Sequence, residues 1–134
     1  MFSPRRSTPS PAADDAGSAV VEFVLVATLL LVVAAGVFQL ALTLHVRNIL
    51  LSSASEGAHI GALADALPTD GAARARDLAR DALGGREVTA AARQVDADDG
   101  PTVEVTLTSE VPVLGLFGAG SITVTAHAPE ESNA

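Results

Sequence analysis

One uninterrupted apolar run limits what this chain can fold into. Between Phe23 and Leu44 the sequence carries no formal charge. At about 1.5 Å of rise per residue this run forms a helix roughly 33 Å long, which is enough to cross a hydrocarbon core of about 30 Å. The alternative is a buried helix of a soluble protein, but such helices rarely continue so far without a polar face. The run therefore predicts a single transmembrane helix, which we place at residues 18–44.

The segment before the helix, residues 1–17, is rich in Pro, Ser and Ala. This composition predicts a disordered leader. Arg5 and Arg6 precede the span, whereas only Arg47 follows it closely, and this bias favours a cytoplasmic N-terminus with the rest of the chain outside. A twin-arginine export signal is disfavoured because no apolar residues follow the arginine pair directly. A cleaved secretory signal would have a shorter apolar region, of about 7 to 15 residues.

Glu22 is the unusual residue of this region, because it is a carboxylate at the head of the apolar run. A charge near the bilayer centre costs about 2.5 to 3.5 kcal/mol on insertion scales, so such a residue tends to pair or to reach water. One interpretation places the Glu22 side chain at the headgroups or at the positive end of the helix dipole. The other gives Glu22 a role in contact with a partner.

Composition limits the remaining functions. The chain has 134 residues, a net charge of −8 and no cysteine. It has room for one small domain beside the span, without a disulfide framework or a thiolate metal site. All eight of its basic residues other than histidine are arginines, and they form no basic cluster of the kind that binds nucleic acid, so we expect no nucleic-acid partner.

Beyond the span, helical spacing continues to Leu67. Ser53, Gly57 and Gly61 stand four residues apart, with Glu56 and Ala58 between them. Small residues at this interval allow another element to approach closely. We therefore predict a helix-packing surface made of Ser53, Glu56, Gly57, Ala58 and Gly61.

The rest of the chain predicts one short helix and a small sheet. Pro68 to Gly71 is expected to break the first helix, and Ala72–Leu83 shows a second helical pattern that ends at a glycine pair. Thr102–Val111 and Ser121–Ala128 alternate apolar and polar residues as strands do, and Glu87–Val95 is expected to be a weaker, Ala-rich first strand. The predicted fold class is α+β, with a long N-terminal helix, a second short helix and an antiparallel sheet of about three strands. We expect residues 45–128 to form an extracytoplasmic domain and residues 129–134 to be a disordered tail.

The apolar connection at residues 112–120 has no charge. It either contacts a partner or a membrane surface, or folds back on its own helix.

Catalytic and metal-binding patterns are weak. His45 and His59 are roughly 21 Å apart if they share a helix, too far to bind one metal ion, and His127 belongs to a strand. Asp96, Asp98 and Asp99 do not have the spacing of an EF-hand calcium loop, which favours a solvated turn. No nucleophile stands beside a base. We therefore expect no catalytic residue, no metal and no cofactor, and we do not expect an enzyme.

Two motifs resemble a known family. Gly17, Ser18, Glu22 and Phe23 resemble the processing site of type IV prepilins and pseudopilins, in which cleavage follows a glycine and a glutamate is the fifth mature residue. Residues 52–62 resemble the segment that follows the membrane helix in TadE-like proteins. Ala54, Glu56, Gly57 and Ala58 match its motif, and His59 replaces the usual arginine.

The resemblance to the TadE-like family implies a minor pilin or pseudopilin of a tight-adherence pilus or secretion system in the cytoplasmic membrane. It implies cleavage between Gly17 and Ser18 by a prepilin peptidase, and a role of Glu22 and Phe23 in assembly. The implied partners are membrane lipid, other pilin or pseudopilin subunits, platform membrane proteins and a secretion ATPase. Asp14 and Asp15 stand where the leaders of that family usually carry basic residues, which predicts slow cleavage. The alternative is an unprocessed, membrane-anchored binding protein that uses the 112–120 loop.

Overall fold

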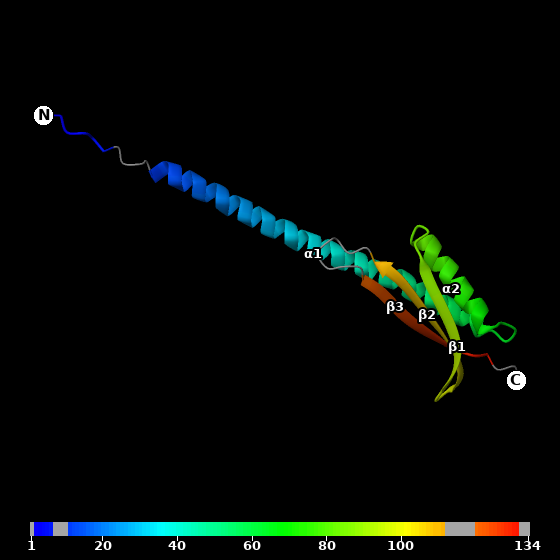
Figure 1. Ribbon diagram of the computed structural model, residues 1–134. Helices are drawn as coiled ribbons and strands as arrows, with labels where there is room; N and C mark the ends of the chain where they lie inside the picture. The colour runs from blue at the N-terminus through cyan, green and yellow to red at the C-terminus, as the bar shows by residue number, and fades with distance from the viewer. Residues whose placement is uncertain (1, 7–10, 112–119, 132–134) are drawn as a thin grey trace. The chain divides into compact units, whose positions relative to one another are not determined.

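The computed structural model describes residues 2–6, 11–111 and 120–131 (Figure 1). Two helices precede three strands, in the order α1 (Pro11–Gly61), α2 (Pro68–Ala82), β1 (Val88–Ala97), β2 (Gly100–Val111) and β3 (Gly120–Pro129). The predicted α+β class, with a long first helix, a short second helix and a three-stranded antiparallel sheet, is confirmed. The chain forms two compact units, Met1–Phe38 and Gln39–Ala134. The 112–120 loop that the sequence singles out lies, except for Gly120, outside the described residues.

The first unit contains the N-terminal part of α1. This helix begins at Pro11, within the segment expected to be disordered, and it therefore includes Gly17 and Ser18. Proline suits the first position of a helix because its missing N–H would have no intrahelical acceptor there. Asp14 lies in the first turn, where a negative charge interacts favourably with the helix dipole. Local sequence therefore favours a helix start ahead of the apolar run.

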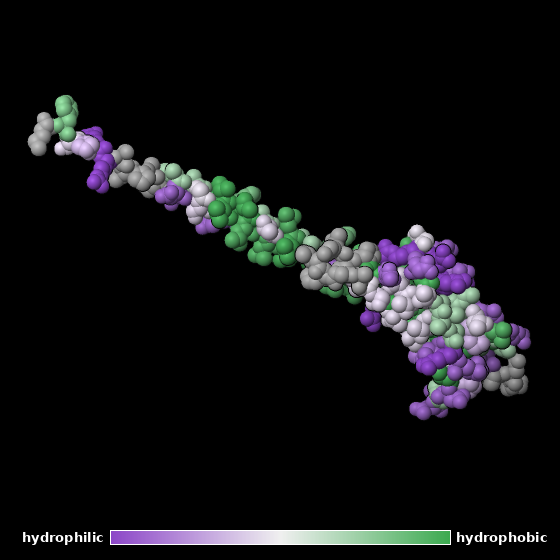
Figure 2. Space-filling view, in the orientation of Figure 1, coloured by the Kyte–Doolittle hydropathy of each residue, from purple (hydrophilic) through white to green (hydrophobic). Residues whose placement is uncertain are grey.

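The apolar side chains of this unit are exposed. Every large hydrophobic residue from Val20 to Phe38 is at least half exposed, including Phe23 at 73% and Leu31 at 71%. Figure 2 shows hydrophobic side chains gathered along this part of the helix. The hydroxyl of Thr28 donates to the carbonyl of Val24 at 2.7 Å, which satisfies the one hydroxyl in the middle of the run. The helix is long and apolar enough to cross a membrane.

The second unit is built on the C-terminal part of α1. Val46, Leu50, Ala54 and Ala58 stand four residues apart and are buried. They belong to one core cluster with residues of the sheet, namely Val103, Val105, Leu107, Val124, Ala126 and Ala128. Ala75 and Ala79 of α2 complete this core, and Figure 1 shows α2 and the strands grouped beside the same part of α1. Their spacing of four residues thus places these side chains on one face of α1, and this apolar stripe packs against the rest of the domain.

The sheet has the order β1-β2-β3, with both pairs antiparallel. In the middle of β2, Val103, Val105 and Leu107 are fully buried, as the alternation predicts. Two polar side chains are also buried in this strand. The Ser109 hydroxyl donates to the Glu87 carbonyl at 3.1 Å, and the Thr102 hydroxyl donates to the Gly100 carbonyl at 3.2 Å. Both hydroxyls therefore satisfy the rule that buried polar groups are hydrogen-bonded.

The second helix corrects one expectation. The Pro68–Gly71 segment, expected to separate the helices, is the first turn of α2. Pro68 occupies the first helical position, and the Asp70 carboxylate accepts a hydrogen bond from the backbone N–H of Leu67 at 3.1 Å. The break lies instead in residues 62–67, and Gly84 and Gly85, both with positive φ, follow the end of the helix as predicted.

The chain end is tied to the domain. The N–H of Glu130 donates to the carbonyl of Pro101 at 2.9 Å, and the N–H of Glu131 donates to the carbonyl of Ala62 at 3.0 Å. The first residues of the expected tail are therefore hydrogen-bonded to β2 and to the end of α1.

Candidate functional site

The predicted processing residues all lie in the N-terminal part of α1. Gly17, Ser18, Glu22 and Phe23 are helical and exposed. A Cβ placed on Gly17 would have no neighbour within 4 Å beyond its own stretch of helix. Ser18 and Glu22 are four residues apart, so they share one face of the helix. The candidate site is thus exposed, and its Gly17–Ser18 bond is in helical conformation.

The predicted packing residues lie in the second unit, where α1 crosses α2. Ser53, Gly57, Ala58 and Gly61 are buried. A Cβ on Gly57 would lie only 2.5 Å from the Ala75 Cβ and would also overlap the Gly71 carbonyl oxygen. A Cβ on Gly61 would lie 3.3 Å from Val103 Cγ1. Gly57 therefore lies directly against α2, and Gly61 lies against both α2 and β2.

Glu56 differs from its neighbours, since its side chain is about half exposed. Its carboxylate lies 3.7 Å from the Arg74 guanidinium of α2. An exposed pair of this kind contributes little to stability, typically less than about 1 kcal/mol. The Glu56–Arg74 pair therefore lies beside the contact between α1 and α2 at Gly57 and Gly61, but it is not the main source of stability of that contact.

Gly71 was not predicted as part of this crossing. It lies inside α2, where glycine is unfavourable by about 1 kcal/mol relative to alanine. A Cβ at Gly71 would lie 3.0 Å from the backbone of Gly61. The sequence signal that could have identified it is the helical pattern of the following residues, which extends back to a proline suited to the first position.

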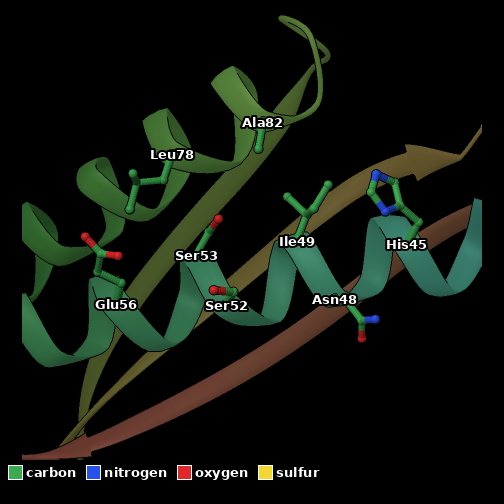
Figure 3. A pocket seen from close by; sticks show the side chains of 8 residues that line it. All are labelled: His45, Asn48, Ile49, Ser52, Ser53, Glu56, Leu78 and Ala82. Carbon is green, nitrogen blue, oxygen red and sulfur yellow. The ribbon is translucent and has the colours of Figure 1, made fainter.

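An open groove lies along the same two helices (Figure 3). Its volume is about 370 Å³, and its lining residues are His45, Asn48, Ile49, Ser52, Ser53, Glu56, Leu78 and Ala82. Figure 3 shows Ile49 and Ser53 pointing toward α2, whereas Asn48 points away from it. The one carboxylate of the groove, that of Glu56, already pairs with Arg74. The groove is open, its lining is more apolar than polar, and its one carboxylate is already paired, so it offers no free charge for a ligand.

The structure brings together two histidines that the sequence left on separate elements. His59 of α1 and His127 of β3 line a second open groove of about 710 Å³. His127 Nε2 lies 2.8 Å from Glu104 Oε2, and Arg93 Nε lies 2.5 Å from Glu104 Oε1. The described residues contain no group of three or more His, Asp or Glu able to hold a metal ion.

The row Arg93, Glu104 and His127 joins all three strands. Arg93 pairs with Glu104 in the β1-β2 register, and Glu104 pairs with His127 in the β2-β3 register. Hydrogen bonds from Arg93 and then from His127 hold the pKa of the Glu104 carboxyl below its usual value. The arrangement stabilises strand pairing on the exposed face of the sheet.

The fold and these sites define a class of protein with one long, exposed apolar helix and a small α+β domain built on the end of that helix. Residues 17–59 match the family described as TadE-like protein. The matched range begins at Gly17 and ends at His59, so it contains the first motif and the matching residues of the second, Ala54, Glu56, Gly57 and Ala58. The resemblance is therefore confirmed over these residues. No curated protein and no solved structure matches the chain.

Proposed function

We propose that this protein is a minor pilin or pseudopilin of a tight-adherence pilus or secretion system. The observation that carries the proposal is the family match over residues 17–59, which begins at the candidate cleavage residue and covers the whole apolar run. The exposed apolar helix supports it, because a helix that is hydrophobic all round requires lipid or other helices around it. The small domain on the same helix supplies a folded part that can be presented outside the membrane.

The proposed location is the cytoplasmic membrane, crossed once by α1. Arg5 and Arg6 remain in the cytoplasm by the positive-inside bias, and the α+β domain lies outside. Of the basic residues near the span, only Arg47 follows it. Presentation at the cell surface or in a pilus follows if the subunit is assembled after processing.

The proposed processing step is cleavage between Gly17 and Ser18 by a prepilin peptidase. Cleavage removes the leader and creates a new α-ammonium group on Ser18. Glu22 then lies one helical turn from that group, at the head of the apolar run. A carboxylate in this position is costly in lipid unless it is paired.

The proposed assembly step pairs Glu22 with the amino terminus of a neighbouring subunit. The pairing offsets the desolvation of both charges only when the two helices are in register. Glu22 thereby specifies the stagger between subunits, with Phe23 packing beside it. Partner pseudopilins, the platform membrane proteins and the secretion ATPase would act on the processed subunit.

The test is the intact mass of the protein expressed with a prepilin peptidase. The wild type is expected to lose residues 1–17 and to begin at Ser18. Gly17→Leu is expected to remain a precursor, because a bulky side chain keeps the peptidase from the backbone at the cleaved bond. Glu22→Gln is the matched control, since it changes the helix without changing the cleaved residues. A wild type that keeps its leader in the presence of active peptidase would contradict the proposal.

The second candidate is an unprocessed, membrane-anchored binding protein. The open groove between α1 and α2 favours it, because the groove belongs to the folded domain and faces solvent. The same mass measurement separates the two functions, since an anchored binding protein would begin at its original N-terminus.

A further inference from the structure

We infer that the first turns of α1 regulate cleavage of the Gly17–Ser18 bond by holding it in a helix that must unwind before the bond is cut. The inference rests on the proposed processing. Its structural basis is the start of α1 at Pro11, six residues before Gly17, with the helix continuing through the bond. A leader that was irregular up to the cleavage point would present this bond without unwinding.

The helix occupies both sides of the scissile peptide group. In α-helical geometry the N–H of Ser18 donates to the carbonyl of Asp14, and the carbonyl of Gly17 accepts from the N–H of Val21. Hydrolysis adds the hydroxyl of water to the Gly17 carbonyl carbon, breaks the C–N bond and leaves the proton on the Ser18 amine. A peptidase must hydrogen-bond the Gly17 oxygen as it becomes tetrahedral. That oxygen becomes free when the bond to Val21 opens.

Only local interactions hold these turns. Residues 12–18 are all exposed, and a Cβ on Gly17 meets nothing within 4 Å beyond its own helix. Ala12 and Ala13 have the strongest helix propensity of any residue type. Asp14, which lies in the first turn, adds a favourable interaction with the positive end of the helix. Gly17 acts in the opposite direction, because glycine weakens a helix at the position where it must open.

This balance gives Asp14 a physical role before the cleavage site. The Asp14 carboxylate stabilises the closed helix, so it lowers the fraction of molecules in which the bond is open. The rate of processing is then the rate of the open form multiplied by its population. Slow processing is therefore a property of the substrate itself.

The experiment measures cleavage rates of full-length variants by a prepilin peptidase in detergent micelles. Ala12→Gly/Ala13→Gly weakens the helix without changing charge or the residues beside the bond, and we expect cleavage about tenfold faster. Asp14→Asn/Asp15→Asn removes the dipole interaction, and we expect cleavage about threefold faster. Asp14→Glu/Asp15→Glu keeps the charges and has a higher helix propensity, so its cleavage should be no faster than that of the wild type.

A matched control places the same substitution elsewhere in the helix. Ala34→Gly/Ala35→Gly introduces two glycines into α1 far from the bond, and it should leave the cleavage rate unchanged. Amide hydrogen exchange of residues 12–18 gives an independent readout, because it measures helix opening directly. Exchange should be faster in the Ala12→Gly/Ala13→Gly variant than in the wild type.

The outcomes separate the inference from the proposed function. Faster exchange together with faster cleavage supports both. Faster exchange with an unchanged cleavage rate overturns the helix regulation and leaves the processing in place. No cleavage of the wild type or of any variant overturns the proposed processing, and the regulation with it.

Discussion

Gly57 of α1 and Gly71 of α2 lie so close that a Cβ on either residue would overlap the carbonyl oxygen of the other. The contact is reciprocal, and it joins backbone to backbone. Glycine is needed at both positions because no larger residue leaves room for the crossing. This crossing holds α2 against the part of α1 that carries the core stripe, so it fixes how the domain is built on the helix.

The first prediction concerns this crossing. Gly57→Ala is expected to lower the free energy of unfolding of the domain by about 1 to 3 kcal/mol, because the added methyl group forces the two helices apart. The measurement is thermal unfolding of the full chain in micelles, followed by circular dichroism since the chain has no Trp or Tyr. Gly36→Ala is the control. Gly36 lies on the same helix, and a Cβ at this position has no neighbour within 4 Å beyond the adjacent helix backbone. Equal melting temperatures for the two variants would contradict the prediction.

The second prediction concerns the pH dependence of the sheet. The pKa of Glu104 is lowered in the folded state by hydrogen bonds from Arg93 and His127. A carboxyl whose pKa is lower in the folded than in the unfolded state stabilises the fold above its unfolded pKa of about 4.3, and this stability is lost as the pH falls through the folded value. The domain should therefore lose stability in acid below about pH 4.

The check is the difference in unfolding midpoint between neutral and acidic pH. Glu104→Gln is expected to show a smaller difference than the wild type, since the neutral amide has no proton to bind. Glu110→Gln lies on the same strand and serves as the control, because its carboxylate forms none of the ion pairs found among the described residues. If Glu104→Gln shows the same pH dependence as the wild type, Glu104 is not the source of the loss of stability in acid.

Much of the fold follows from periodicity in the sequence. The alternation of Val103, Val105 and Leu107 identifies β2 and its buried face, because the side-chain period of a strand is two. The spacing of Gly57 and Gly61 predicts a close approach to the helix. It does not identify the partner, because Gly71 reads as part of a turn until the start of α2 is known.

The remainder depends on choices that local sequence leaves open. Pro68 is compatible both with a break between helices and with the first turn of a helix. The choice depends on where α1 ends, which the local sequence does not specify. The row of Arg93, Glu104 and His127 depends on strand register, which the sequence of one strand cannot specify. The helix start at Pro11 does not follow from composition, because a segment rich in Pro, Ser and Ala is typical of disorder, whereas Ala12, Ala13 and Asp14 favour a helix locally.

The third prediction concerns topology. Protease added to intact spheroplasts is expected to remove residues 70–134 while leaving an N-terminal tag intact, because the proposed orientation places Arg5 and Arg6 in the cytoplasm. Lysed spheroplasts are the control, in which the tag should also be digested. Protection of residues 70–134 in intact spheroplasts would reverse the proposed orientation.

The last prediction concerns Glu22 after cleavage. Glu22→Gln removes the charge but keeps the size of the side chain, so the variant is expected to be processed normally and to fail to associate with wild-type subunits. Glu22→Asp keeps the charge on a side chain one methylene shorter, and we expect it to associate partly, because the carboxylate reaches less far toward the neighbouring amino terminus. The measurement is the amount of each processed variant recovered with a tagged wild-type subunit from detergent-solubilised membranes. Thr28→Val, which replaces a hydroxyl already bonded to its own helix, is the control and should associate as well as the wild type. If Glu22→Gln is recovered as fully as this control, association does not depend on the charge of Glu22, and the proposed ion pair between subunits is wrong.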